Sequence, residues 1–447
     1  MLRTGEGRPF LLHEMKKQLG GSGLLLAFAF AAVAAEPWTL ERAVRHALTN
    51  SPDVRIAGQR IVAAQAGIAQ ANAAFWPRAT FQSGYNVTDN PMLSFGNILN
   101  QRAYSPSINF NDVPDTDNLN VRGLLTVPLY TGGKVTADRK AAKANTAAAR
   151  QEAEAVRNTL GFEVARGFFT AQKTRTFIQA AQAAVVSYET NLDTARKRLE
   201  AGTLLRADLL DIEVRLAQAR EDLVRARNAN ALVLRALQNV LGVEEPEFTV
   251  AETAPPLLAP EMAASQPRPD LLAATERAKS AEAQVGSAKS AYLPQVSAFG
   301  SLDYDRGWEL NGDGNSYTAG ALLRWDLWDG NLTRAKVAEA RANAEVAREQ
   351  ERKLRLAVNL EVEQARLGLE QATERLMVGD QSVAQAGESL ALTRDRFAEG
   401  LALATQLIDA QTALTAARVR HAEAESDRQI AIAALRKALG LPPLEIK

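Results

Sequence analysis

The chain contains no cysteine and only three histidines among its 447 residues. The absence of cysteine excludes disulfides, thiolate metal sites and a lipidated cysteine. The histidines are scattered (His13, His46 and His421), which argues against a histidine-based metal site. Lysine plus arginine equals aspartate plus glutamate, at 52 each, so no basic excess points to nucleic acid. We therefore expect no metal, no cofactor and no nucleic-acid partner.

Catalytic motifs and long apolar runs are also missing. No nucleophile–base pair, phosphate-binding glycine loop or metal-ligand spacing occurs in the sequence, which argues against an enzyme. After Ala35 there is no apolar run of about 18 residues, the length that a membrane-spanning helix needs. If the mature chain enters a membrane, we therefore expect it to do so as β-strands.

The first 35 residues have the features of a secretory signal peptide. Met15-Lys16-Lys17 is a short basic region, an apolar run covers residues 23–34, and small residues suited to cleavage precede Glu36. The run is too short for a membrane anchor, so we prefer a signal peptide over 1–35 that starts at Met15 to an N-terminal anchor helix. The mature protein is then expected to leave the cytoplasm.

The two halves of the chain repeat the same landmarks. Pro52-Asp53 recurs as Pro269-Asp270, an offset of 217 residues, whereas Gly202 recurs as Gly400, an offset of 198 residues. The change of 19 residues falls between two predicted strands, and the helical stretches keep a constant spacing. This regularity predicts a tandem duplication. Its parts are a first repeat over 36–250, a linker over 251–268, a second repeat over 269–442 and a tail over 443–447.

Four segments alternate apolar and polar side chains over about ten residues, the pattern and length of membrane-barrel strands. They form one pair over 78–88 and 118–130 and a second pair over 295–304 and 317–327. An ordinary water-soluble sheet with one buried face is the alternative. The segment between the first two strands reads as a polar loop, and its counterpart in the second half is short. Aromatic residues suited to a membrane interface lie at the strand ends: Trp76, Tyr130, Trp325 and Trp328.

Stretches without proline over 134–200 and 332–398 predict two helices roughly 100 Å long. A second helix follows each of them, over 205–241 and 403–438, with apolar residues at coiled-coil spacing. Shorter helices are predicted over 39–49 and 52–74, and Pro77 ends the second of these. Because helices 52–74 and 205–241 together approach the length of the long helix, they could stack end to end beside it.

The number of strands predicts an oligomer. The smallest bacterial barrels have eight strands, so the four strands of one chain cannot close a barrel. An open edge in lipid would leave backbone groups unpaired, at several kcal/mol each. Two chains would give eight strands, whose interior side chains fill, whereas three chains would give twelve strands and a lumen.

The order of these features resembles the outer-membrane efflux proteins of the TolC type. The resemblance covers residues 36–442 and rests on the turns LYTGGKV and LWDGNLT and on RLEAGTLLRADLLDIEVRL and RFAEGLALATQLIDAQTAL. It implies a mainly α fold with a membrane β-barrel: a homotrimer in which a 12-stranded barrel in the outer membrane of a Gram-negative bacterium continues into an α-helical periplasmic tunnel. It also implies a periplasmic membrane-fusion (adaptor) protein and an inner-membrane pump of the RND or ABC type as partners.

The resemblance further implies a narrow, acidic aperture near the two glycine turns. By motif position, Asp208 and Asp211 follow Gly202, and Gln406 and Asp409 follow Gly400. Plain helix capping is the alternative, with Asp208 as an N-cap and Asp211 in the first turn. Two positions that form a lock in family members hold Phe397 and Ala402 here, so that lock is not expected. The turns themselves are candidate docking points for the adaptor: Gly202, Thr203, Gly400 and Leu401.

Two further functions compete with an export duct. A periplasmic coiled-coil adaptor or scaffold, not inserted in the membrane, would explain the long helices but not four barrel-length strands. A stand-alone diffusion porin would explain the strands but has no need of such helices. The sequence leaves the cargo open among drugs, metals, small metabolites and secreted proteins.

Overall fold

The computed structural model describes residues 36–109, 111–244, 248–261, 266–442 and 444. The predicted signal peptide over 1–35 lies outside these residues, and so does most of the predicted tail. The fold that follows is that of the unit Pro37–Lys447. Among the described residues, no helix combines the length and the apolar character needed to cross a membrane.

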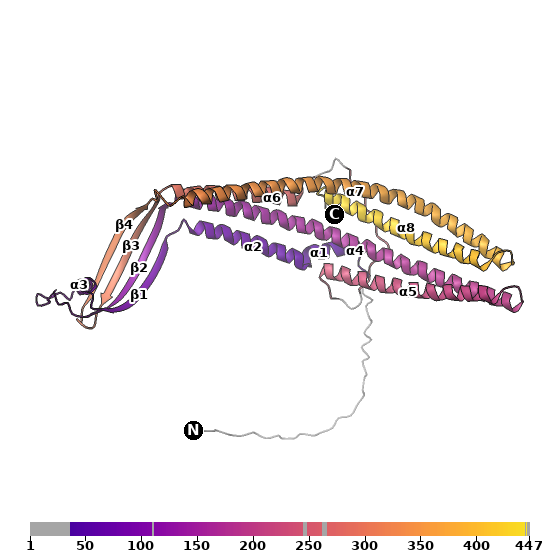
Figure 1. The fold of residues 1–447 in the computed structure, drawn as a ribbon, viewed down its shortest axis with the longest axis horizontal. Coiled ribbons are helices and arrows are strands. Elements are labelled where there is room, and N and C mark those ends of the chain that lie inside the picture. The colour runs from indigo at the N-terminus through magenta and orange to yellow at the C-terminus, as the bar shows by residue number, and fades with distance from the viewer. Residues whose placement is uncertain (1–35, 110, 245–247, 262–265, 443, 445–447) are drawn as a thin grey trace, which may run out of the picture. The chain divides into compact units, whose positions relative to one another are not determined.

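The described chain consists of long helices and one four-stranded sheet, as Figure 1 shows. The predicted mainly α fold with four strands per chain is confirmed. The helices are α1 (Leu40–Asn50), α2 (Pro52–Ala73), α3 (Pro91–Asn100), α4 (Lys134–Glu200), α5 (Arg206–Leu241), α6 (Pro269–Lys289), α7 (Leu332–Ala398) and α8 (Ala404–Ala438). The strands are β1 (Arg78–Thr88), β2 (Thr116–Tyr130), β3 (Gln295–Arg306) and β4 (Asp313–Arg324).

Glycines follow the last helix of each half and allow an earlier segment of the chain to approach closely. Gly242 follows α5 at a φ of +69°, and a Cβ there would lie 2.9 Å from Cδ of Pro52, which begins α2. Gly440 follows α8 at +75°, and a Cβ there would lie 2.8 Å from the carbonyl oxygen of Gln266, just before α6. Helices α2 and α5 both pack along α4, and α6 and α8 both pack along α7. The end-to-end stacking expected for helices 52–74 and 205–241 is therefore found.

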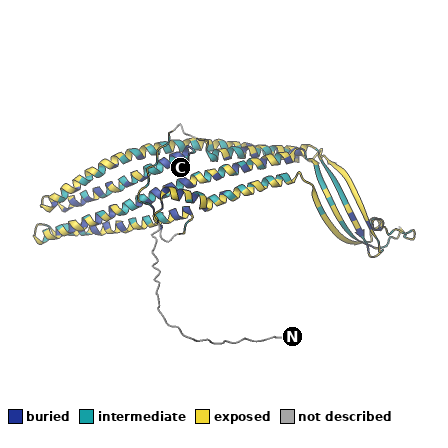
Figure 2. Ribbon diagram, turned by 180° about the vertical axis from the view of Figure 1, so that it is seen from behind, coloured by how far each residue is buried: buried dark blue, intermediate teal, exposed yellow. Residues whose placement is uncertain are grey.

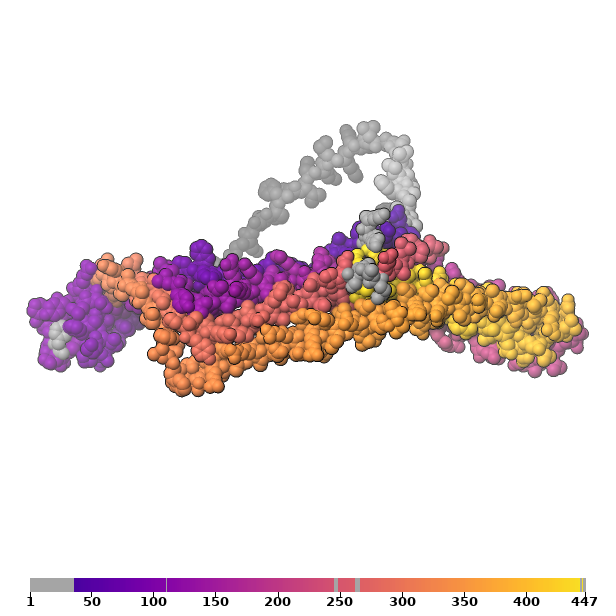
Figure 3. Space-filling view, turned by 90° about the horizontal axis from the view of Figure 1, so that it is seen from above, coloured from indigo at the N-terminus to yellow at the C-terminus, as the bar shows by residue number. Residues whose placement is uncertain are grey.

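The two long helices have the same length but are buried to different extents. Each contains 67 residues, yet α4 buries three times as many residues as α7. Helix α4 packs against α2, α5, α6 and α8, whereas α7 packs mainly against α6 and α8. Helix α7 forms one long edge of the helical part (Figure 3), and many of its residues are exposed (Figure 2). Its exposed apolar side chains include Leu356, Leu360, Val378 and Leu392.

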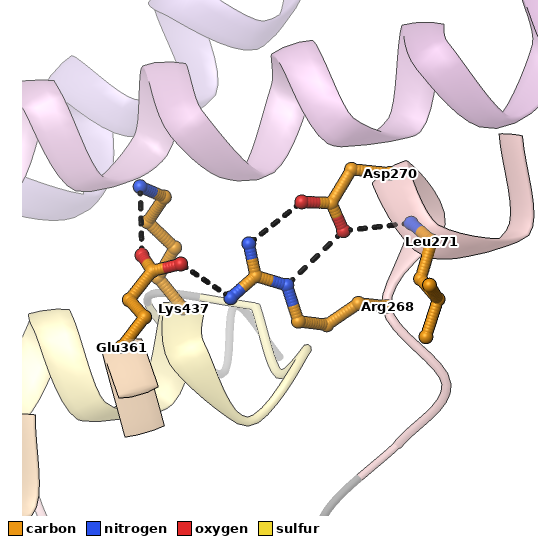
Figure 4. A network of polar contacts seen from close by, with 5 residues as sticks. All are labelled: Arg268, Asp270, Leu271, Glu361 and Lys437. Carbon is orange, nitrogen blue, oxygen red and sulfur yellow. Dashed lines mark hydrogen bonds and ion pairs between the residues drawn. The ribbon is translucent and has the colours of Figure 1, made fainter. Parts of the chain in front are cut away.

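A charged network joins the start of α6 to α7 and α8 (Figure 4). Arg268 donates to both carboxylate oxygens of Asp270, at 3.1 and 2.7 Å, and to Glu361 Oε2 at 2.6 Å. Lys437 completes the network with a contact of 3.3 Å to the other oxygen of Glu361. Only 11% of the Arg268 side chain is exposed, so the guanidinium is held inside the helical part.

The four strands form an antiparallel sheet in the order β1-β2-β3-β4, so β1 and β4 are its two edges. The prediction of a strand over 317–327 was wrong at both ends, because β4 covers Asp313–Arg324. Arg324 is paired with Gln295, and Pro294 precedes that residue; β3 therefore offers no partner for residues beyond Arg324. The segment read as a polar loop contains α3, which the sequence analysis did not predict.

Candidate functional site

The two turns that join α4 to α5 and α7 to α8 have the same backbone geometry. Gly202 and Gly400 have φ values of +71° and +84°, a conformation that favours glycine. The N–H after each glycine donates to the carbonyl five residues earlier, from Thr203 to Arg198 at 2.9 Å and from Leu401 to Arg396 at 2.7 Å. Each turn is therefore a Schellman motif that satisfies the last carbonyl groups of a long helix.

Arg198 connects the two turns. Its guanidinium donates to the carbonyl oxygen of Phe397 at 2.8 Å and to that of Thr203 at 3.0 Å. It also lies over the Phe397 ring, 4.8 Å from the centroid, and this ring is 1% exposed. One cation therefore fixes the end of α7 against the turn between α4 and α5. Arg198 was not among the predicted site residues, although an arginine stands four residues before each turn glycine.

A hollow lies between the two turns, and residues from both of them line it. Its walls include Gly202, Thr203, Gly400 and Leu401, the four predicted docking residues. Leu205, Leu401 and Leu403 are each about two-thirds exposed, at 71%, 66% and 67%. The structure therefore brings the four residues together in one recess with an exposed apolar rim.

The predicted aperture residues occupy equivalent places on α5 and α8. Asp208 and Gln406 are each the third residue of their helix, because Leu205 and Leu403 are the N-caps. The capping alternative was therefore wrong for Asp208 as an N-cap, and Asp211 lies beyond the first turn. Gln406 caps its own helix, since its Oε1 accepts from the Leu403 N–H at 3.1 Å.

The side chains of Asp208, Asp211 and Asp409 have no cationic partner in the described part of the chain. Asp208 is half-buried beside the hollow, and Asp211 and Asp409 are exposed. Within the part of the chain that the structure describes, no hydrogen bond or ion pair to these carboxylates is found. Carboxylates without a cationic partner favour cations and repel one another when they approach.

The sheet has one apolar and one polar face, which follows from its register. Residues paired across the strands share a face, so Phe81, Gly123, Leu302 and Tyr317 lie together on one side. Phe81, Leu302 and Tyr317 are 74%, 71% and 79% exposed. Large apolar side chains therefore cover this face without any contact that buries them.

The opposite face carries polar and charged residues. Asn118 and Asn120 both donate to Asp305, at 2.7 and 3.0 Å, and Arg122 pairs with Asp303. These side chains form a continuous row of polar groups across β2 and β3. A sheet of this kind suits an apolar solvent on one side and water on the other.

The four predicted interfacial aromatics lie where the sheet joins the helices, and all are exposed: Trp76 at 72%, Tyr130 at 45%, Trp325 at 53% and Trp328 at 76%. The Trp325 indole N–H donates to the Tyr292 carbonyl at 3.2 Å, which leaves the ring at the surface. Aromatic rings with a polar tip are favoured at the boundary between lipid and water.

The sequence matches a known protein family over most of its length. A family model described as "Outer membrane efflux protein" matches residues 43–243 and 262–441. The chain is 24% identical over 324 residues to outer membrane protein OprJ of Pseudomonas aeruginosa, covering 69% of this chain and 67% of OprJ. It is 27% identical over 398 residues to protein CyaE of Bordetella pertussis, covering 86% of this chain and 80% of CyaE.

The fold is similar to that of a solved channel. The CmeC outer membrane channel of Campylobacter jejuni superposes with a TM-score of 0.80 at 16% identity, over 90% of this chain and 85% of CmeC. At this identity the likeness concerns the fold alone.

Proposed function

The chain belongs to the outer membrane efflux protein family, and on that premise we propose that it is the exit duct of a tripartite efflux or type I secretion system. The family consists of channel proteins rather than enzymes, and the chain is assigned to the outer membrane of a Gram-negative bacterium. In this proposal the duct is passive. An inner-membrane pump of the RND or ABC type supplies the energy, and a periplasmic adaptor links the pump to the duct.

The two-faced sheet with two free edges is the observation that carries the proposal. The apolar face suits lipid and the polar face suits an aqueous lumen. The outer edges of β1 and β4 have no partner strand within the described chain, and unpaired backbone groups in lipid cost several kcal/mol each. Three copies that pair β1 with β4 of the next chain would close twelve strands around a lumen.

The exposed side of α7 supports the same arrangement in the helical part. Helix α7 packs against α6 and α8, but Leu356, Leu360 and Val378 on its other side are 63%, 58% and 63% exposed. Neighbouring chains that cover this side would bury these side chains, each worth about 1.5–3 kcal/mol when fully buried. We infer a homotrimer whose helices form a tunnel through the periplasm.

The inner mouth of this tunnel is proposed to lie at the helix turns. Asp208, Asp211 and Asp409 of three chains would surround it with carboxylates, and Gln406 would contribute an amide. Such a ring attracts cations and resists closure through mutual repulsion. The recess between the turns, with its exposed leucines, is the proposed docking point for the helical adaptor.

Mass and conductance test the duct. The protein purified in detergent is expected to contain three chains by light scattering, and to form ion-conducting channels in planar bilayers. A monomeric particle, or one that extracts from cells without detergent, would sink the proposal. The second outcome would favour the periplasmic adaptor or scaffold, which the family assignment and the exposed apolar face of the sheet argue against.

The aperture has a test of its own. Asp409→Ala is expected to reduce the cation selectivity of single channels and their block by divalent cations. Asp193→Ala is the matched control, because it removes the same charge from α4 near the tip but breaks only a surface pair with Lys197. Unchanged selectivity in Asp409→Ala would remove Asp409 from the aperture and leave the duct itself untouched.

A further inference from the structure

Helix α3 packs with a mainly polar side inward and an apolar side outward, the reverse of a normal surface helix. Ser94, Asn97, Ile98 and Gln101 follow one side of the helix and its C-cap and are 0%, 7%, 0% and 1% exposed. On the other side, Met92 and Leu99 are 77% and 47% exposed. Exposed apolar side chains on a firmly packed helix imply a partner that the described part of the chain does not supply.

The buried side of α3 lies on the polar face of the sheet. Asn97 donates to Thr116 Oγ1 at 3.1 Å, and Gln101 donates to Asn118 Oδ1 at 3.1 Å. Thr116 and Asn118 pair with Thr88 and Asn86, in the same alternation that places Asn120 beside Asp305. In the proposed duct this polar face surrounds the lumen, so α3 lies over the lumen side at the end of the strands far from the helices (Figure 1).

Glycines in the β3–β4 hairpin fix this position. A Cβ at Gly312 would lie 2.6 Å from the carbonyl oxygen of Gln101, and a Cβ at Gly314 would overlap the carbonyl oxygen of Asn100. Arg102 adds hydrogen bonds to Asn315, of 2.9 Å to its side chain and 3.3 Å to its backbone. The C-terminal end of α3 therefore rests directly on the β3–β4 hairpin, and the helix cannot move closer to the strands.

The width of the proposed barrel determines what can cover the apolar side of α3. A barrel of 12 strands spaced about 4.8 Å apart and tilted by about 40° measures roughly 24 Å between opposite backbones. Three helices of about 10 Å diameter pack within a circle of roughly 22 Å. This is nearly the full width between backbones, and the inward side chains of the strands narrow the passage further. Three copies of α3 on the lumen side at the end of the strands therefore cannot stay apart, and they would bury Met92 and Leu99 against one another.

We propose that α3 helices from three chains meet at the outer mouth of the duct and form an apolar constriction. This inference rests on the proposed trimeric duct. An apolar constriction excludes ions and water while it is closed, because a narrow apolar passage dewets. It would open when the three helices separate, and a permeating molecule with apolar groups would contact Met92 and Leu99 on its way out.

The absence of native cysteine allows a direct test with single-cysteine variants of the full chain. Leu99→Cys and Met92→Cys, treated with a short bismaleimide, are expected to join two chains; up to roughly two-thirds of the chains in a trimer can be joined in this way. Val87→Cys is the matched control, since Val87 is 62% exposed near the same end of β1 but lies on the apolar face. It should give no joined chains.

The oligomeric state is measured on the same samples, which separates the two proposals. Trimers in which neither Met92→Cys nor Leu99→Cys joins chains faster than Val87→Cys would overturn the constriction and leave the duct intact. Particles with fewer than three chains would overturn the duct itself. Adding Gly314→Leu to Leu99→Cys should lower the yield of joined chains severalfold, because the larger side chain displaces α3.

Discussion

Replacing Arg268 should weaken the junction of α6, α7 and α8 much more than replacing a surface arginine with similar partners. Arg268 is 11% exposed and bonds to two carboxylates, Asp270 and Glu361. Arg268→Met keeps most of the side-chain volume but leaves these carboxylates close together with only Lys437 to balance them. Arg366→Met is the matched control, since Arg366 also bonds to two glutamates but is 42% exposed.

The expected loss lies between two limits. Removing one partner of a fully buried ion pair costs about 3–5 kcal/mol, whereas an exposed pair contributes about 0–1 kcal/mol. Asp270 and Glu361 are 32% and 38% exposed, so solvent screens part of the repulsion between them. We expect a loss of about 2–3 kcal/mol for Arg268→Met, because charged hydrogen bonds are worth about 1.5–3 kcal/mol. The control should lose less than about 1 kcal/mol.

Thermal unfolding in detergent, followed by circular dichroism, measures the difference. For a chain of this size the loss corresponds to a fall of about 3 °C in the transition temperature, against about 1 °C or less for the control. Hydrogen exchange at the first turn of α6 should also become faster only in Arg268→Met. Equal shifts for the two variants would refute the reasoning, because burial would then make no difference to the strength of the network.

Three further predictions concern pH and the turns. Desolvation, the largest single effect, acts to raise the pKa of Asp270 and of Glu361, but the hydrogen bonds and charge of Arg268 outweigh it and hold both pKa values below their ordinary range. The network should therefore contribute its full stability above the ordinary carboxyl pKa values of about 4, and this stability should be lost as the pH falls below them. In acid, the transition temperature of Arg268→Met should then approach that of the wild type. Gly242→Ala should lower the transition temperature more than Gly133→Ala, since both glycines have a positive φ but only the first abuts another helix. Arg198→Ala should accelerate hydrogen exchange at both tip turns and raise the basal conductance, whereas unchanged exchange at the turn after α7 would show that Arg198 does not join them.

The long helices were predictable because local information suffices for them. Alanine-rich stretches without proline can only be helical over such a length, and the glycines that end α4 and α7 stand at positions where a Schellman turn needs a positive φ. The buried positions of α5 that face α4 also follow from the sequence: Ile212, Leu216, Ala219 and Leu223 keep the expected coiled-coil spacing. The spacing of apolar residues therefore predicts which side of α5 is buried, even when the helix that it packs against is not known.

The parts that the sequence analysis missed depend on contacts between distant segments. Helix α3 has a start signal, because Asn90 caps the helix and Pro91 occupies its first position. The many Asn, Pro, Ser and Asp residues around it nevertheless make the whole segment read as a polar loop. At the tip, the contact from Arg198 to Phe397 joins residues 199 positions apart. No local pattern in the sequence reports such a pair of residues.

In the proposed trimeric duct, the dimensions of the barrel give a reason why the two halves differ at the outer end. The first half carries α3 in its long loop, whereas the second half joins β3 to β4 directly through residues 307–312. If both loops carried such a helix, a trimer would bring six helices to one mouth, and a ring of six helices of about 10 Å needs roughly 30 Å. A 12-stranded barrel offers only about 24 Å. The outer mouth of the proposed duct would therefore have room for only one α3 per chain. The short β3–β4 hairpin then has a role of its own, because its glycines provide the surface on which the single α3 rests.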